Sequence, residues 1–279
     1  MRLGRGPQDI HNVQVEEFAD WLLQIANGLF RDSSDGKSVI RIPDNLLLDI
    51  EFLVLHDLVL YIYPNILLRT SSMDYFKDRS ILSPTLDVMT EVNNHVMSLI
   101  PSNEKVYLSS DTLLNEDGHL ESELYTMSTE SLNALNCSGI PQHRLVLKIG
   151  VLVMLIRNID QSNGLCHGHN IGEVVFIPKM NMVPNNETLP IRFTRRQFPI
   201  MLCFAMTINK SQGQTPSTVG VYLSRPIFTH GQLYVALSRV NSYSGLKILF
   251  VSSNGIVSNH TINVVYRKVF VNLLQSIPP

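Results

Sequence analysis

Short apolar runs alternate with a segment of helical spacing over the last part of the chain. The runs at residues 198–204, 219–223 and 246–251 each predict a buried strand. Between the second and third run, four apolar residues recur at helical spacing, namely Leu233, Ala236, Leu237 and Val240. That spacing predicts a helix with one buried stripe. Strands that alternate with helices in this way indicate a parallel α/β sheet.

The N-terminal part of the chain carries similar patterns. Six apolar residues share one face of a predicted amphipathic helix: Val15, Phe18, Ala19, Leu22, Leu23 and Ala26. A strand is predicted at residues 80–83, and Pro84 and Thr85 mark the start of a helix that runs to about Leu99. Residues 52–68 are apolar enough to suggest a membrane span, but polar residues and a proline interrupt them, which favours a buried strand or helix.

The middle of the chain is rich in strand patterns, with strands predicted at residues 145–149, 151–157, 173–177 and 189–194. The composition suits a folded protein, since 44% of the 279 residues are hydrophobic and only 16% are charged. The chain has three cysteines, Cys137, Cys166 and Cys203, and they lie far apart. An odd number at such distances argues against a disulfide framework and fits a reducing compartment.

The net charge of −2 weakens a simple prediction of nucleic-acid binding. Neutralisation of phosphates supplies most nonspecific affinity, so a stand-alone nucleic-acid module usually has a basic surface. Positive charge is only local here, in Lys148, Arg157, Arg192, Arg195 and Arg196. These residues suit a nucleic-acid contact and an ordinary solvated face equally well.

The predicted strand at residues 198–204 leads into a polar loop with the composition of a phosphate contact. Gly213 lets the backbone approach an anion, and Lys210 supplies a positive charge. Three hydroxyls accompany them, from Thr207, Ser211 and Thr215. Farther along, Arg239 lies at the end of the predicted helix, where the helix dipole alone would also favour a cation.

These two segments carry a family resemblance. Residues 205–215, AMTINKSQGQT, resemble motif V of the Pif-one-type DNA helicases of superfamily one B, and residues 234–239, YVALSR, resemble motif VI. Helicases encoded by plant Helitron transposons are the most similar group. Residues 1–3 resemble motif IV, residues 79–85 the next strand and turn of the family, and residues 145–160 the start of an inserted domain called 2B.

The resemblance implies a fold and a domain order. The expected fold is an α/β, RecA-like parallel sheet of the P-loop-NTPase type, which forms the second motor domain, 2A. Domain 2A would comprise residues 1–143 and 201–279, and a small SH3-like β domain, 2B, would occupy residues 144–200. Relatives carry more residues where residues 166–173 stand, so the 2B barrel is expected to be shortened and its edges open.

The resemblance also implies roles for single residues. Arg239 would be the arginine finger on the γ-phosphate of ATP, and Arg2 would be a second phosphate contact. The nucleotide would lie near Gln212, Gly213, Thr215 and Gln232, while the DNA backbone would contact Thr85, Thr207, Lys210 and Ser211. An ordinary helix N-cap is the alternative for Thr85. The family usually has Asn after this threonine, whereas this chain has Leu86.

The phosphate loop of an ATP-driven motor is not found in the sequence. Gly36-Lys37-Ser38 imitates its end, but Arg31 stands where the loop needs its first glycine, so a surface turn is predicted. The chain therefore resembles a helicase cut just before motif IV. ATP and Mg²⁺ would act only with a first RecA-like domain as partner. Cys166, His167 and His169 hint at zinc, yet a single cluster of three does not favour a metal site.

Three functions stay open at this point. The chain is the C-terminal motor half of an ATP-dependent 5′ to 3′ DNA helicase that acts on single-stranded DNA, or a non-catalytic single-stranded-DNA-binding remnant of a transposon helicase, or a folded scaffold that binds neither ligand. The family resemblance favours the first function, with nuclear localisation and no membrane segment.

Overall fold

The computed structural model describes residues 9–30, 36–48, 54–70, 72–114, 128–160, 175–184, 189, 191–240, 242–252 and 254–266. It divides into two compact units, one formed by residues 1–96 and 204–279 and the other by residues 97–203. The strand-rich unit therefore starts near residue 97, whereas the sequence placed its start at residue 144. The reason is that two strands before residue 143, β3 and β4, pair with strands after it.

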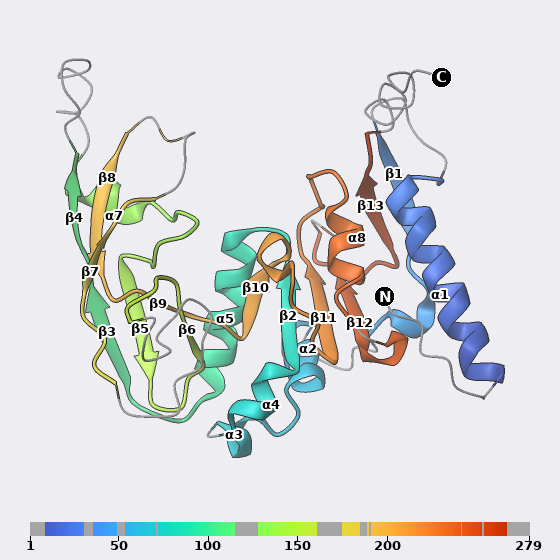
Figure 1. Cartoon of the computed structure of the whole chain (residues 1–279), viewed down its shortest axis with the longest axis horizontal. Coiled ribbons are helices and arrows are strands. Elements are labelled where there is room, and N and C mark those ends of the chain that lie inside the picture. Colours follow the sequence, from blue (N-terminus) through green and yellow to red (C-terminus); the bar gives the residue numbers. More distant parts are fainter. Residues whose placement is uncertain are drawn as a thin grey trace. The chain divides into compact units, whose positions relative to one another are not determined.

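The first unit is built on four parallel strands in the order β10-β2-β11-β12 (Figure 1). Their bounds are β2 Arg79–Ser83, β10 Ala205–Thr207, β11 Thr218–Leu223 and β12 Leu246–Phe250. The expected parallel α/β sheet is thus confirmed, with β2, β11 and β12 close to their predicted positions. The apolar run at residues 198–204 is divided: Ile200–Leu202 forms β9 in the second unit, and the strand that enters the polar loop is β10.

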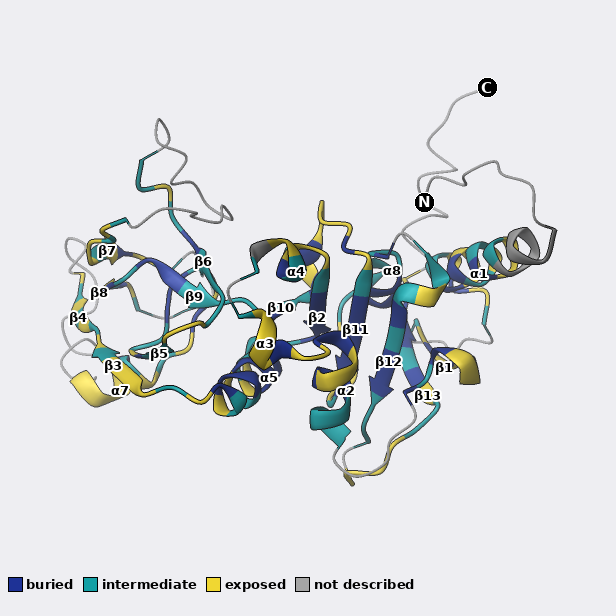
Figure 2. Ribbon diagram, turned by 90° about the horizontal axis from the view of Figure 1, so that it is seen from below, coloured by how far each residue is buried: buried dark blue, intermediate teal, exposed yellow. Residues whose placement is uncertain are grey.

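Helices cover both faces of this sheet (Figure 2). They are α1 Asp9–Asn27, α2 Val54–Ile62, α3 Ile66–Arg69, α4 Met73–Lys77, α5 Leu86–Leu99 and α8 Gln232–Leu237, with short 3₁₀ turns at η1 Asp44–Leu46, η2 Ile208–Ser211 and η3 Tyr243–Gly245. Among the described residues, no helix is long and apolar enough to cross a membrane. The apolar stretch at residues 52–68 supplies α2 and α3 instead.

Alternation along β11 explains why both faces are buried. Val219, Val221 and Leu223 pack into one apolar core with α1 and α8. Gly220 points to the opposite face, where α2 approaches so closely that a Cβ atom would lie 2.8 Å from Cγ1 of Ile62. The strand therefore reads as a continuous apolar run, as expected for a parallel strand buried on both sides.

An antiparallel pair completes the first unit, formed by β1 Lys37–Arg41 and β13 His260–Val264. The tripeptide Gly36-Lys37-Ser38 leads into β1 and not into a helix. A phosphate loop needs a helix at that point, so the structure agrees with the exclusion of this segment as a phosphate loop.

The second unit consists of small antiparallel sheets, β3-β5, β4-β8-β7 and β6-β9. Their bounds are β3 Glu104–Leu108, β4 Ser110–Leu113, β5 Arg144–Lys148, β6 Val153–Leu155, β7 Met180–Met182, β8 Phe193–Gln197 and β9 Ile200–Leu202, with one helix described, α7 Thr129–Ala134. The prediction of a strand at residues 173–177 is wrong for residues 175–177, the part of this range that the structure describes. These residues have no strand structure, and β7 begins after them. The shortened segment at residues 166–173 lies outside the described residues.

Candidate nucleotide and nucleic-acid site

Several of the predicted site residues lie at the carboxyl edge of the parallel sheet. Strands β2 and β10 run side by side, and their last residues, Ser83 and Thr207, are partners in the register. The start of α8 reaches the same edge, because Nε2 of Gln232 donates a hydrogen bond to the carbonyl oxygen of Pro84 at 3.3 Å. Ligands of open α/β sheets bind outside this edge of the strands. The two sequence motifs and Thr85 are thus brought together by the topology.

The loop after β10 is a 3₁₀ turn followed by a tight turn. Backbone N–H of Gln214 donates to the carbonyl oxygen of Ser211 at 3.1 Å. Gln212 has φ −61° and ψ 130°, and Gly213 has φ +87°. These angles belong to a type II turn, which requires a positive φ at its third residue. Gln212, Gly213 and Thr215 are exposed, so this part of the predicted nucleotide contact is accessible.

Gly213→Ala is expected to destabilise the protein by about 1–2 kcal/mol, because an L-residue with a Cβ is strained at this φ. A Cβ atom would meet nothing within 4 Å, so crowding adds no further cost. Urea unfolding measures the change. Gly213→Asn is the matched variant, since Asn tolerates the left-handed region, and it should lose less than Ala. Equal stability of Gly213→Ala and the unmodified chain would contradict the turn assignment.

Lys210 lies half-buried in the 3₁₀ turn before this loop. Burial lowers the pKa of its ammonium group below the usual value, because desolvation disfavours the charged form. No hydrogen bond or ion pair joins Lys210 to any residue that the structure describes. A partly desolvated cation without a counter-charge gains more from a bound phosphate than a fully solvated lysine does.

Arg239 lies just beyond the end of α8 and is half-buried. Its Nε donates to the carbonyl oxygen of Val235 at 3.0 Å, and its Nη2 donates to Oγ of Ser238 at 3.2 Å. No carboxylate forms an ion pair with it among the described residues. The guanidinium is therefore held at the helix end, where the dipole favours a cation, and its Nη1 has no hydrogen bond to a described residue.

Two predicted ligand contacts are buried in the structure and are revised. Ser211 is 2% exposed, and its Oγ donates to the carbonyl oxygen of Ile208 at 2.7 Å. Gln232 is also 2% exposed; besides its bond to Pro84, its Oε1 accepts from backbone N–H of Phe228 at 3.4 Å. Both side chains are almost inaccessible and bonded to the backbone, so in this arrangement they brace the loop and the start of α8.

The remaining predicted contacts differ in their placement. Oγ1 of Thr85 accepts from backbone N–H of Val88 at 3.4 Å, which is the N-cap that stood as the alternative for this residue. Thr207 is half-buried at the end of β10. It is the N-cap residue of the 3₁₀ turn η2, but its side chain forms no capping hydrogen bond with that turn. Arg2 lies outside the described residues.

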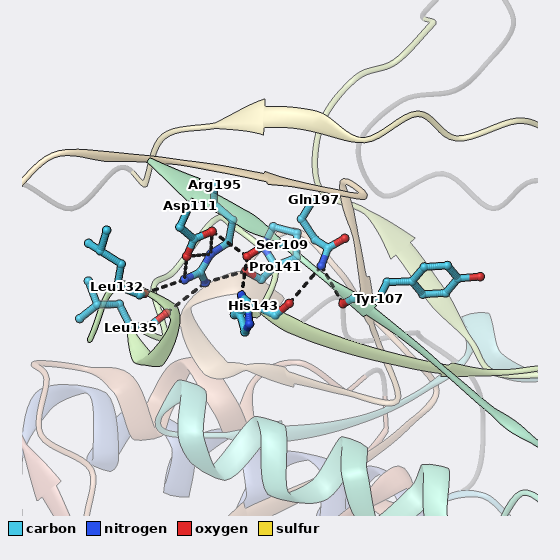
Figure 3. A network of polar contacts seen from close by, with 9 residues as sticks. All are labelled: Tyr107, Ser109, Asp111, Leu132, Leu135, Pro141, His143, Arg195 and Gln197. Carbon is cyan, nitrogen blue, oxygen red and sulfur yellow. Dashed lines mark hydrogen bonds and ion pairs between the residues drawn. The ribbon is translucent and has the colours of Figure 1, made fainter. Parts of the chain in front are cut away.

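The basic residues of the second unit do not form one solvated face. Arg195 is fully buried and forms an ion pair with Asp111, whose side chain is also 0% exposed, at 2.7 Å between Nη2 and Oδ2 (Figure 3). Its guanidinium also donates to the carbonyl oxygens of Leu132, Leu135 and Pro141. All three nitrogens of the guanidinium group thus donate hydrogen bonds inside the protein. Arg195 is therefore no longer a candidate for a nucleic-acid contact.

The polar network around this ion pair continues through the strands. Oγ of Ser109 donates to Oδ1 of Asp111 at 2.6 Å and lies 2.8 Å from Nδ1 of His143. Nε2 of Gln197 donates to the carbonyl oxygens of Tyr107 and His143 (Figure 3). Buried networks of this kind specify one arrangement of strands when all members are satisfied.

Lys148 is a second basic residue with a structural role. Its side chain is only 9% exposed, and its Nζ donates to the carbonyl oxygens of Met97 and Ile100, each at 3.1 Å. Cys166, His167 and His169 lie outside the described residues. Within the described part of the chain, no group of three or more His, Cys, Asp or Glu could hold a metal ion.

Parts of this chain are similar in sequence to known DNA helicases. The family model described as DNA helicase Pif1, 2B domain, matches residues 130–174. The ATP-dependent DNA helicase PIF1 of Danio rerio is 33% identical over 154 residues, which cover 46% of this chain and 23% of that protein. PIF1 of Homo sapiens is 36% identical over 123 residues, or 38% of this chain and 19% of that protein.

A solved structure extends the similarity to the fold. The crystal structure of Pif1 helicase from Candida albicans matches 93% of this chain and 57% of that chain, with a TM-score of 0.53 and 21% sequence identity. The parallel sheet with helices on both faces is thus an α/β fold of the RecA-like kind. Parts of the chain are thus similar in sequence to Pif1-type DNA helicases, as the resemblance of the two motifs predicted, and its fold is similar to that of a Pif1 helicase. The matched region spans about a fifth of the length of these curated relatives.

Proposed function

We propose that this chain is the C-terminal motor half of an ATP-dependent DNA helicase that moves 5′ to 3′ along single-stranded DNA. The observation that carries the proposal is the position of Lys210 after β10, where the 3₁₀ turn of motif V contacts the helix of motif VI. Its ammonium group is partly desolvated and has no ion-pair partner among the described residues. The curated relatives are ATP-dependent DNA helicases, which supports the same activity for a longer protein that includes this chain.

ATP hydrolysis requires a first RecA-like domain as partner. By the family resemblance, that domain would supply the phosphate loop and the acidic ligands of Mg²⁺. On this chain, Arg239 would approach the γ-phosphate, Arg2 would add a second phosphate contact, and Gln212, Gly213 and Thr215 would lie beside the nucleotide. When bound, ATP would supply the γ-phosphoryl group that is transferred to water, with ADP as the leaving group.

Single-stranded DNA would bind through Thr207 and Lys210, with the amides at the start of α5 near Thr85 as a further phosphate contact. The domain assignment follows: the first unit corresponds to domain 2A and the second to a 2B domain of SH3-like type. Nuclear localisation and a transposon origin are part of the same proposal and rest on the family resemblance alone.

Lys210→Ala is expected to lower the affinity for single-stranded DNA several-fold and to reduce the slope of log K against log salt by about 0.7, the value for one phosphate contact on a single strand. Fluorescence anisotropy of a labelled oligonucleotide at several salt concentrations measures both quantities. Lys77→Ala is the control, because Lys77 is an exposed lysine paired with Asp74 at 2.9 Å.

An unchanged salt slope for Lys210→Ala would contradict a phosphate contact at this residue. Complete absence of salt-dependent binding by the unmodified chain would favour the scaffold over both DNA-binding functions. The same titration therefore separates a folded scaffold from the helicase and from the DNA-binding remnant.

A further inference from the structure

Strand β10, which leads into the Lys210 loop, is short and lies at the edge of the parallel sheet. Its inner side pairs with β2: backbone N–H of Ile81 donates to the carbonyl oxygen of Phe204 at 3.3 Å, and Oγ of Ser83 donates to the carbonyl oxygen of Met206 at 3.4 Å. Because successive residues of a strand direct their polar groups to opposite sides, Ala205 directs its N–H and C=O away from β2. No neighbouring strand pairs with that side.

A side chain of α5 takes the place of the absent strand. Backbone N–H of Ala205 donates to Oδ1 of Asn93 at 2.9 Å, and Nδ2 of Asn93 donates to the carbonyl oxygen of Ala205 at 3.2 Å. The amide of Asn93 has the same donor and acceptor geometry as a peptide group, so it closes both bonds at once. Figure 1 shows α5 beside β10.

The same point of the chain is held from α2. The hydroxyl of Tyr63 donates to the carbonyl oxygen of Phe204, and both side chains are fully buried. Asn93 is 3% exposed and Ala205 is 1% exposed, so water cannot replace their bonds. The position of β10 is therefore set by hydrogen bonds on both sides of the strand.

We propose that Asn93 is a positioning residue that fixes β10 and thereby places the Lys210 loop for binding single-stranded DNA. The 3₁₀ turn that carries Lys210 begins at Ile208, directly after the last residue of β10. Because no residues separate β10 from the turn, a displacement of β10 also displaces Lys210. This role rests on the proposed function of the loop, whereas the placement of β10 does not.

The test compares Asn93→Leu with two variants of the same helix. Leucine is similar in size to Asn but forms neither bond with Ala205. Asn94→Leu is the surface control, since Asn94 is exposed, and Val92→Ala is the core control, since Val92 is 0% exposed and its truncation lowers stability by loss of packing alone. Asn93→Gln is a milder variant that adds no charge and keeps both the donor and the acceptor, but its extra methylene displaces the amide from Ala205.

Hydrogen exchange and oligonucleotide binding are measured on the full chain. For Asn93→Leu, exchange over residues 204–213 should accelerate about tenfold or more, while exchange over β11 and β12 stays as in Val92→Ala. Affinity for a single-stranded oligonucleotide should fall about tenfold relative to Val92→Ala, at a denaturant concentration where both are folded. If Asn93→Leu does not fold, Asn93→Gln is expected to show the same local pattern with a smaller amplitude.

Exchange over residues 204–213 that matches Val92→Ala in both Asn93 variants would overturn the positioning role. Accelerated exchange with unchanged affinity would also overturn it, since the loop would then bind without β10 being fixed. Absence of oligonucleotide binding by the unmodified chain would instead refute the proposed function, and the exchange data would still show whether Asn93 holds β10.

Discussion

Arg239→Ala is expected to abolish ATP hydrolysis by a protein in which this chain is joined to a first RecA-like domain, with a loss of about 10³ to 10⁵ in turnover. The guanidinium would neutralise the charge that develops on the transferring phosphoryl group. In the structure the residue is held at the end of α8 by Val235 and Ser238, and no carboxylate of the described residues competes for it. A steady-state phosphate-release assay measures turnover.

Arg225→Ala is the matched control, because Arg225 is an exposed arginine of the same unit whose nearest ion-pair partner, Asp87, lies 4.0 Å away. Its turnover should stay within a factor of about two of the unmodified protein. Arg239→Lys tests the geometry, since lysine keeps the charge but lacks the planar fork, and it should not restore turnover. Turnover by a folded Arg239→Ala protein equal to that of the Arg225→Ala control would refute the arginine-finger assignment.

Arg195→Leu is expected to destabilise the second unit by about 3–5 kcal/mol, the usual cost of leaving one partner of a buried ion pair without its counter-charge. Asp111 would lose its pair, and three backbone carbonyls would lose their donor. The arginine lies over the ring of Phe193, with 5.4 Å from its Cζ to the ring centroid, so packing is lost as well. Denaturant unfolding monitored by circular dichroism measures the change.

Arg196→Leu serves as the control, since Arg196 is the exposed neighbour on the same strand, and its effect should be within about 0.5 kcal/mol. Replacement of both Arg195 and Asp111 by leucine should recover part of the lost stability, because no buried charge is then left unpaired. Similar stability of Arg195→Leu and Arg196→Leu would show that the ion pair contributes little to the fold.

Elements with a strong local pattern could be predicted from the sequence. Residues 219–223 form an apolar run, and residues 80–83 carry Ile81 and Leu82 before Pro84; both segments are strands of the sheet. The start of α5 after Pro84 and Thr85 follows from capping chemistry that lies within a few residues. The candidate site loop could also be proposed from local signals, since Gly213 and Lys210 stand in one short motif.

Features that depend on distant contacts could not be predicted. Arg195 looks like a surface arginine beside Arg196, and only its pairing with Asp111, 84 positions earlier, makes it a core residue. The same applies to the border of the second unit, which β3 and β4 set by pairing with later strands. Asn93 had no signal either, because its partner Ala205 lies 112 positions away and a single Asn in a helix is common.

The most direct measurement of the central claim is the ATPase activity of a protein that joins this chain to a first RecA-like domain, with and without a single-stranded oligonucleotide. The account predicts hydrolysis that rises strongly when the oligonucleotide is added and that disappears in Arg239→Ala. A folded joined protein that binds the oligonucleotide but hydrolyses ATP no faster with it than without it would contradict a motor function and leave a DNA-binding remnant.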